Sequence, residues 1–191
     1  MLIYKKYTKK EIRYGDNYYG ATHTAKTAVS KISKITGINY LSQDLVKMGL
    51  IRSKTTNLTA YCDELHMPYL WNITKEIIKT AIENKQDLIV EGCYVPINFQ
   101  DDFDKEYRNE IRLFCLNMSK NYIENHFDDI VKYENVAENR KFKGDFDKEG
   151  IINDNEKYSK YDRDKGFCKI EIEKFDLDKM ANYIVSRLNN D

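Results

Sequence analysis

The chain has 191 residues, of which 41% are hydrophobic and 32% are charged, and its 31 basic residues balance its 31 acidic residues. This composition predicts a single folded domain over residues 1–191, and the zero net charge argues against a nucleic-acid-binding protein, which usually carries a basic excess. The apolar runs are too short for a membrane span or a secretory signal, so we expect a cytoplasmic protein with no nucleic-acid or membrane partner. Nothing in the sequence indicates the oligomeric state.

The stretch Gly20–Thr27, "GATHTAKT", has nearly the pattern G-x-x-x-x-G-K-[ST] of a phosphate-binding loop. In such a loop, backbone N–H groups and the N-terminus of the following helix bind phosphate oxygens. A lysine contacts the β- and γ-phosphates, and a serine or threonine holds Mg²⁺. We therefore expect Gly20 to form the turn, Lys26 and Thr27 to take the last two roles, and the loop as a whole to bind ATP through Gly20, Ala21, Thr22, His23, Thr24, Ala25, Lys26 and Thr27.

Two features of this region depart from the pattern. Ala25 stands where a glycine lets the backbone approach the phosphates closely, so its methyl group is expected to narrow the loop. The segment before the loop, "KKEIRYGDNYYG", is too polar for a strand at the centre of a parallel sheet. Either that strand is short and irregular, around Ile12–Tyr14, or the N-terminal region is rearranged.

After the loop, apolar periodicity predicts a helix that starts near Lys26, has Val29, Ile32 and Ile35 on its core-facing side and ends at Gly37. The same reasoning predicts strands at 38–41, 87–92, 111–118 and 167–173, and helices at 45–51, 60–84, 119–133 and 177–189. Strands and helices alternate, which predicts an α/β fold with a parallel sheet. The polar stretch 134–165 is interpreted as an insertion rather than a second domain.

The segments "GATHTAKTAVSKISKITGINYLSQDLVKMGLI" and "IIKTAIENKQDLIVEGCYVP" resemble the small P-loop kinases of the adenylate-kinase-like superfamily. They are most similar to its bacterial adenylate kinase-like and 2-phosphoglycerate kinase-like members. The resemblance covers about residues 20 to 185. It implies a three-layer P-loop NTPase sandwich with a mostly parallel five-stranded sheet, in which 134–165 forms a lid.

The resemblance also implies roles for individual residues. Asp44 matches the acid that faces the acceptor hydroxyl as a general base, although an N-cap of the helix at 45–51 is an equally simple interpretation. Lys47 stands where nucleoside-monophosphate kinases place a substrate-binding arginine, and Arg52 is a second candidate on the acceptor side. Glu91 matches an acid that holds Mg²⁺, and Arg140 matches a lid arginine that stabilises the transferred phosphoryl group. The sequence "GCYVP" lacks the arginine that follows in the monophosphate kinases, which argues against adenylate kinase activity proper.

Three functions agree with these observations. The first is an ATP- and Mg²⁺-dependent phosphotransferase that acts on a small-molecule or nucleotide acceptor. The second is a degenerate kinase-like protein that binds a nucleotide without turnover and acts through a partner or ligand. The third is a kinase-type toxin or modifying enzyme that acts on a sugar nucleotide or an antibiotic.

Overall fold

The computed structural model describes residues 2–4, 18–20, 25–60, 63–133, 147–159, 167–172 and 176–190. The strands are β1 (Leu2–Tyr4), β2 (Tyr18–Gly20), β3 (Tyr40–Ser42), β4 (Leu88–Glu91), β5 (Ile111–Met118) and β6 (Phe167–Ile172). The α-helices are α1 (Ala25–Thr36), α2 (Gln43–Arg52), α3 (Asp63–Glu83), α4 (Lys105–Glu110), α5 (Lys120–Tyr133), α6 (Lys148–Ser159) and α7 (Leu177–Asn190), with a short 3-10 helix, η1 (Phe99–Asp102). None of the helices in these ranges is long and apolar enough to cross a membrane.

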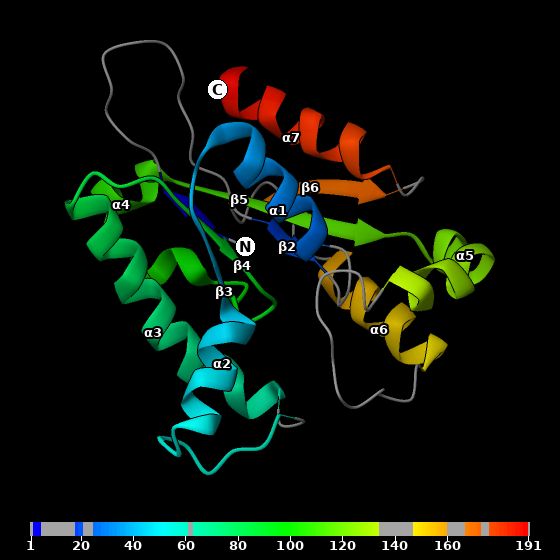
Figure 1. Ribbon diagram of the computed structural model, residues 1–191, viewed down its shortest axis with the longest axis horizontal. Coiled ribbons are helices and arrows are strands. Elements are labelled where there is room, and N and C mark those ends of the chain that lie inside the picture. The colour runs from blue at the N-terminus through cyan, green and yellow to red at the C-terminus, as the bar shows by residue number, and fades with distance from the viewer. Residues whose placement is uncertain are drawn as a thin grey trace.

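In the described part of the chain the sheet has six strands, whereas the resemblance implies five. Five strands run parallel in the spatial order β3-β4-β2-β5-β6, and β1 pairs antiparallel with both β4 and β5 (Figure 1). The centre of the sheet is therefore filled by two short strands in succession. β1 lies between the first residues of β4 and β5, and β2 lies between the residues that follow.

The sequence left two alternatives for the strand before the loop: a short, irregular strand around Ile12–Tyr14, or a rearranged N-terminal region. The structure shows a rearranged N-terminal region, and Ile12–Tyr14 lies outside the described residues. Leu2 pairs with both Val90 and Leu113, and Tyr18 pairs with Glu91 and Phe114. The short segments "LIY" and "YYG" supply the central position, and neither contains a charged residue, as suits strands with a neighbour on each side. The general prediction of an α/β fold with a parallel sheet is confirmed.

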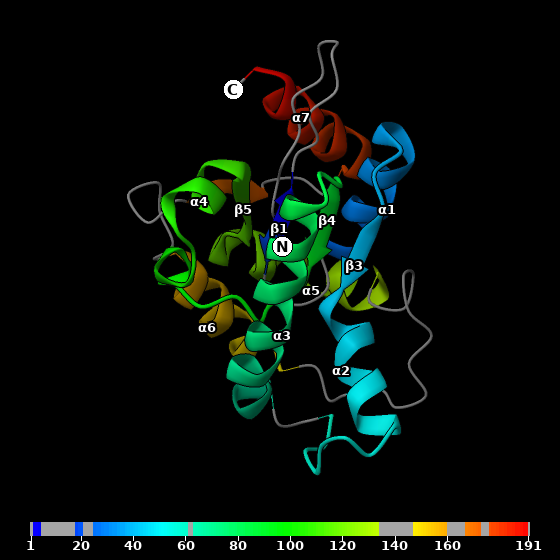
Figure 2. The same cartoon turned by 90° about the vertical axis from the view of Figure 1, so that its left-hand side faces the viewer.

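Helices cover both faces of the sheet, so the arrangement has three layers (Figure 2). On one face, α1 and α7 pack on alternate residues of β5, namely Phe114, Leu116 and Met118. On the other face, Leu113 and Cys115 of β5 belong to a second core cluster that includes Trp71 and Ile78 of α3 and Tyr158 of α6. This alternation explains why residues 113–116 are all apolar, since both faces of the strand are buried there.

The local signals at helix ends give most boundaries correctly. Gly37 ends α1 with φ of 73°, and its N–H donates to Ser33 O over 2.8 Å. Ser119 Oγ accepts from the N–H of Tyr122 over 3.1 Å and caps α5 as predicted. The predicted core face of α1 is wrong at Ile35, which is 52% exposed, because the buried stripe of this helix runs through Ala28, Val29 and Ile32.

Part of the predicted insertion belongs to the core. Residues 148–159 form α6, which packs on α5 and β5, and its Ile151, Ile152 and Tyr158 are buried. The remainder of 134–165 lies outside the described residues, so the lid stays a prediction.

Candidate functional site

The carboxyl end of the central strand leads directly into a helix. β2 ends at Gly20 and α1 begins at Ala25, so four residues connect the two elements. Because β2 is parallel to β4 and β5, this connection lies at the end of the sheet where those strands have their carboxyl ends, which is called the carboxyl edge below. Ligands of open α/β sheets bind at this edge, and the N-terminus of a twelve-residue helix favours an anion there.

The predicted phosphate-loop residues Ala21, Thr22, His23 and Thr24 lie outside the described residues. Of Lys26 and Thr27, the structure describes the backbone, in the first turn of α1, and not the side chains. The structure shows a strand before these residues and a helix after them, and the roles of the individual residues remain predictions.

Two neighbouring strands bring a serine and a glutamate together at this edge. Ser42 ends β3, Glu91 ends β4, and the two residues are partners in the parallel register. Ser42 Oγ donates to Glu91 Oε2 over 2.9 Å, and Glu91 is only 4% exposed. Ser42 is also the residue before α2, but its hydroxyl makes no capping bond because it is used by Glu91. The interpretation of Asp44 as the N-cap is therefore wrong, since α2 starts at Gln43.

Gln43 is a fully buried amide that joins three segments. Its Oε1 accepts from the backbone N–H of Tyr94 over 3.0 Å, and its Nε2 donates to Thr74 Oγ1 of α3 over 3.1 Å. Gly92 approaches this amide so closely that a Cβ there would lie 2.7 Å from Gln43 Cβ and 2.8 Å from Gln43 Cδ. A glycine after Glu91 is therefore required by the contact with Gln43, and this contact sets the path of the chain beyond β4.

Asp44, Lys47 and Tyr94 form a second polar cluster beside the first. Lys47 Nζ donates to Tyr94 Oη over 2.6 Å and lies 3.2 Å from Asp44 Oδ1. It also lies 5.2 Å from the centroid of the Tyr94 ring. The side chains of Lys47 and Asp44 are 11% and 20% exposed. The ammonium is thus largely removed from water and paired with a carboxylate, a phenol oxygen and an aromatic ring.

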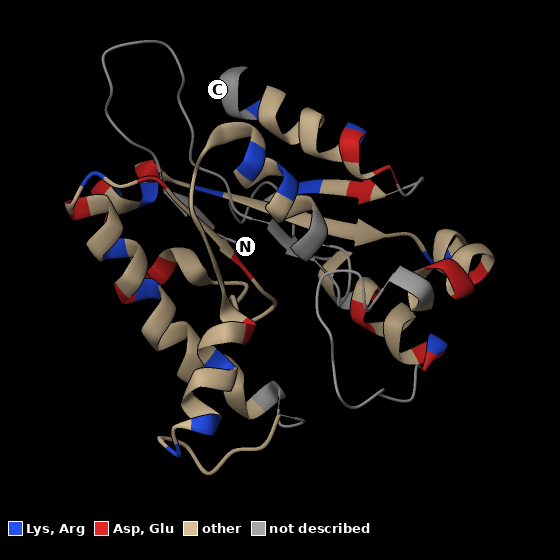
Figure 3. Cartoon of the chain, in the orientation of Figure 1, with Lys and Arg blue, Asp and Glu red and all other residues tan. Residues whose placement is uncertain are grey.

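The structure brings together some of the predicted residues and separates others. Asp44, Lys47 and Glu91 all lie at the carboxyl edge of β3 and β4. Arg52 is exposed in the last turn of α2, whereas Asp44 lies in the first turn, about 12 Å away along the helix axis. Figure 3 shows this separation as acidic colour at the start of α2 and basic colour further along it. Arg140 lies outside the described residues.

Sequence reasoning missed Ser42, Gln43 and Tyr94 as parts of the site. The polar run "SQD" directly after a strand indicates a site at the strand end, but only its third residue was given a role. Tyr94 carries no comparable signal, because its contact with Lys47 joins residues 47 positions apart.

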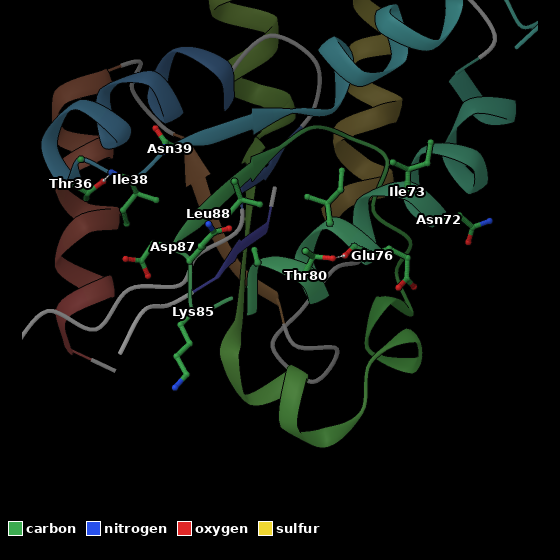
Figure 4. A pocket seen from close by; sticks show the side chains of 14 residues that line it. Thr36, Ile38, Asn39, Asn72, Ile73, Glu76, Thr80, Lys85, Asp87 and Leu88 are labelled. Carbon is green, nitrogen blue, oxygen red and sulfur yellow. Dashed lines mark hydrogen bonds between the residues drawn. The ribbon is translucent and has the colours of Figure 1, made fainter. Parts of the chain in front are cut away.

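A large cavity lies beside α3 near the amino ends of β3 and β4. Its volume is about 990 Å³, and Figure 4 shows α3 on one side of it and the α1–β3 connection on the other. Asn39, which precedes β3, and Leu88, which begins β4, both line it. The cavity therefore opens at the amino ends of these strands and contains none of the predicted site residues.

The comparison with solved structures identifies the fold. The chain aligns with a gluconokinase from Sinorhizobium meliloti 1021 at a TM-score of 0.55 and 12% sequence identity, and the alignment covers 94% of this chain and 95% of that protein. The chain has a kinase-like fold. An uncharacterized protein from Eubacterium ventriosum ATCC 27560 aligns at a TM-score of 0.46 and 16% identity, over 95% of this chain and 100% of that one. No protein-family model and no curated protein sequence matches the chain.

The oxygen atoms at the carboxyl ends of β3 and β4 suit the Mg²⁺ that the sequence predicts. Mg²⁺ prefers hard oxygen ligands and is usually held by one or two carboxylates together with phosphates and waters. Glu91 provides such a carboxylate, already oriented by Ser42. Within the described residues no group of three or more His, Cys, Asp or Glu side chains gathers at one point, so a fully protein-held metal site is not seen there.

Proposed function

We propose that the protein is an ATP- and Mg²⁺-dependent phosphotransferase that acts on a small-molecule or nucleotide acceptor. The observation that carries the proposal is the meeting of two polar clusters, Ser42–Glu91 and Asp44–Lys47–Tyr94, at the sheet edge where β2 turns into α1. The kinase-like fold supports it, since phosphoryl transfer in such folds depends on positioning and electrostatics at this edge.

In this proposal the backbone of residues 20–27 and the N-terminus of α1 bind the nucleotide phosphates, with Lys26 at the β- and γ-phosphates. Glu91 and Thr27 hold Mg²⁺, which, when bound, neutralises negative charge on the phosphates. Ser42 keeps the buried Glu91 carboxylate in one orientation through its 2.9 Å hydrogen bond. Arg140 contributes a positive charge from the predicted lid.

Asp44 orients the acceptor hydroxyl and accepts its proton. The acceptor oxygen forms a bond to the γ-phosphorus while the bond between that phosphorus and the bridging oxygen of ADP breaks. The electron pair of the broken bond leaves with ADP, and the proton of the hydroxyl goes to Asp44. This carboxylate is fit for the role because Lys47 restrains one of its oxygens and the side chain remains partly exposed.

A second function, a nucleotide-binding protein without turnover, is favoured by two observations. Ala25 replaces the second glycine of the loop, and the central strand position is divided between β1 and β2 instead of being one long strand. A shorter β2 provides less support for the loop that follows it. The kinase-type modifying enzyme is an acceptor variant of the first proposal and uses the same residues.

Thermal unfolding and ADP formation separate these proposals. Mg-ATP is expected to raise the melting temperature if the loop binds nucleotide, because a ligand that binds only the folded state stabilises it. Lys26→Ala is expected to remove that stabilisation. ADP release that depends on an added acceptor, measured with a coupled assay over a metabolite panel, distinguishes the kinase from the non-catalytic protein. Absence of Mg-ATP stabilisation in the wild type would refute both.

A matched pair of variants tests the metal role. Glu91→Gln keeps the shape of the side chain and removes its charge, so it is expected to abolish the additional stabilisation that Mg²⁺ provides over ATP alone. Glu83→Gln, an exposed glutamate at the end of α3, is the control and is expected to behave like the wild type.

A further inference from the structure

The Asp44–Lys47–Tyr94 cluster also bears on the chemical class of the acceptor, an inference that rests on the proposed function. A lysine that recognises a phosphate or carboxylate group of a substrate has to direct its ammonium at that substrate. Lys47 instead directs its ammonium at Tyr94 Oη, 2.6 Å away, and at Asp44 Oδ1, 3.2 Å away. Its side chain is 11% exposed, so these contacts are made largely out of water.

An anionic acceptor would have to replace Asp44 as the partner of Lys47. Removing one member of a buried ion pair is strongly unfavourable, because the other charge stays buried without compensation. The anion would also lie beside the Asp44 carboxylate, which pairs with Lys47 over 3.2 Å and repels a second negative charge there. Such like-charge contacts select against a ligand as effectively as attractive contacts select for one.

We infer that the acceptor is an uncharged hydroxyl compound, such as a polyol or sugar, and that Lys47 and Tyr94 are positioning residues that hold Asp44 rather than ligands of the substrate. An uncharged hydroxyl group needs only one oriented carboxylate to accept its hydrogen bond, and the cluster contains such a carboxylate. Asp44 is the only member of the cluster with a carboxylate, and its side chain is more exposed than that of Lys47, at 20% against 11%.

The test measures how strongly an anion is bound at Lys47. Inorganic phosphate is the probe because it is small enough to reach Lys47 whatever the shape of the acceptor. It is titrated by calorimetry into protein saturated with Mg²⁺ and a non-hydrolysable ATP analogue, so that the phosphate loop is occupied. Asp44→Asn keeps the shape of the side chain and removes the charge that pairs with Lys47.

Asp44→Asn is expected to bind phosphate about tenfold or more tightly than the wild type, because a charge-assisted hydrogen bond to Lys47 becomes available. The double variant Asp44→Asn/Lys47→Met is expected to lose that gain. Lys47→Met alone is expected to leave the weak phosphate binding of the wild type unchanged. Circular dichroism and urea unfolding establish whether each variant is folded. If Asp44→Asn does not fold, the phosphate affinity of Lys47→Met compared with that of the wild type decides whether Lys47 binds the anion.

Two results would overturn the inference. One is phosphate binding by the wild type that is as tight as that of Asp44→Asn and is lost in Lys47→Met, since Lys47 would then be an anion ligand. The other is a folded Asp44→Asn variant without any gain in phosphate affinity. The ATP analogue is first titrated into the protein with Mg²⁺, so that failure of the analogue to bind refutes the proposed phosphotransferase separately from the charge of the acceptor.

Discussion

Gly92 provides the sharpest test of how the site is built, because it lies against the fully buried amide of Gln43. In Gly92→Ala the new Cβ would lie 2.7 Å from Gln43 Cβ and 2.8 Å from Gln43 Cδ, and closer still to Oε1. These separations are about 1 Å shorter than the optimum for carbon atoms. Rotation of the amide alone cannot relieve them, since Gln43 Cβ is attached to the backbone of α2.

The cost follows from the contacts that must be given up. Overpacking a buried position costs about 1–3 kcal/mol. Displacement of Gln43 also weakens its hydrogen bonds to Thr74 and to the N–H of Tyr94, each of which contributes about 1 kcal/mol. We expect Gly92→Ala to lower the free energy of unfolding by about 2–4 kcal/mol. With a urea m-value of about 2 kcal/mol/M, the unfolding midpoint falls by about 1–2 M.

Gly49→Ala is the matched control, since Gly49 lies inside α2 and a Cβ there meets no atom within 4 Å. Alanine is a better helix former than glycine, so the free energy of unfolding of this variant is expected to rise by about 0.5–1 kcal/mol. The double variant Gly92→Ala/Gln43→Ala is expected to be more stable than the sum of the single effects, because truncation of Gln43 removes Cδ and Oε1 from the clash. A Gly92→Ala variant as stable as the wild type would refute the close packing of Gly92 on Gln43.

Three further predictions test other parts of the fold. Burial of Asp102 opposes its ionisation, but hydrogen bonds from Lys75 and Trp71 outweigh this effect and hold its pKa below the usual 3.8. The ionised carboxylate therefore stabilises the fold above about pH 3.8. This stabilisation is lost as the pH falls through the lowered pKa. Asp102→Asn is expected to be less stable than the wild type at pH 7, with the difference shrinking toward pH 3 in urea titrations, and a difference independent of pH would contradict this. Burial raises the pKa of Cys115 to about 12, so mass spectrometry after alkylation at pH 8 is expected to find Cys115 unmodified in the folded protein and labelled in urea; labelling under native conditions would show that the strand is accessible. Gly37→Ala is expected to lower the free energy of unfolding by about 1 kcal/mol because φ at Gly37 is 73°, whereas Gly49→Ala is expected to raise it. An unchanged free energy of unfolding in Gly37→Ala would argue against a left-handed residue at the end of α1.

Local patterns predicted most elements that are determined by neighbours in the chain. The mainly apolar stretch 111–118 predicted β5 with the observed bounds, Ser119 predicted the start of α5, and Gly37 predicted the end of α1. The prediction of Ile35 as a core residue failed because the direction in which α1 is buried depends on where α7 lies. The missing β1 has the same origin: three residues, "LIY", become a strand only when β4 and β5 leave a place between them.

The candidate site divides along the same line. Glu91 and the run "SQD" could be read as strand-end residues, because a buried apolar strand followed by polar side chains points to the edge of a parallel sheet. The pairing of Ser42 with Glu91, the contact of Gln43 with Gly92 and the bond from Lys47 to Tyr94 join residues that are 47 to 49 positions apart in the chain. No periodicity carries such information, because these contacts are set by the register between β3 and β4.

The order of apolar, polar and glycine residues thus determined by itself that this chain forms alternating strands and helices, and it predicts a phosphate-binding loop before α1. The period at which apolar residues recur is a local property of the sequence, so it predicts a helix or a strand without information on the element that packs against it. Only the tertiary structure decided how the centre of the sheet is filled and that Lys47 is paired with Asp44 and Tyr94. The reason is that buried polar groups must find partners wherever the packing of the strands and helices places them.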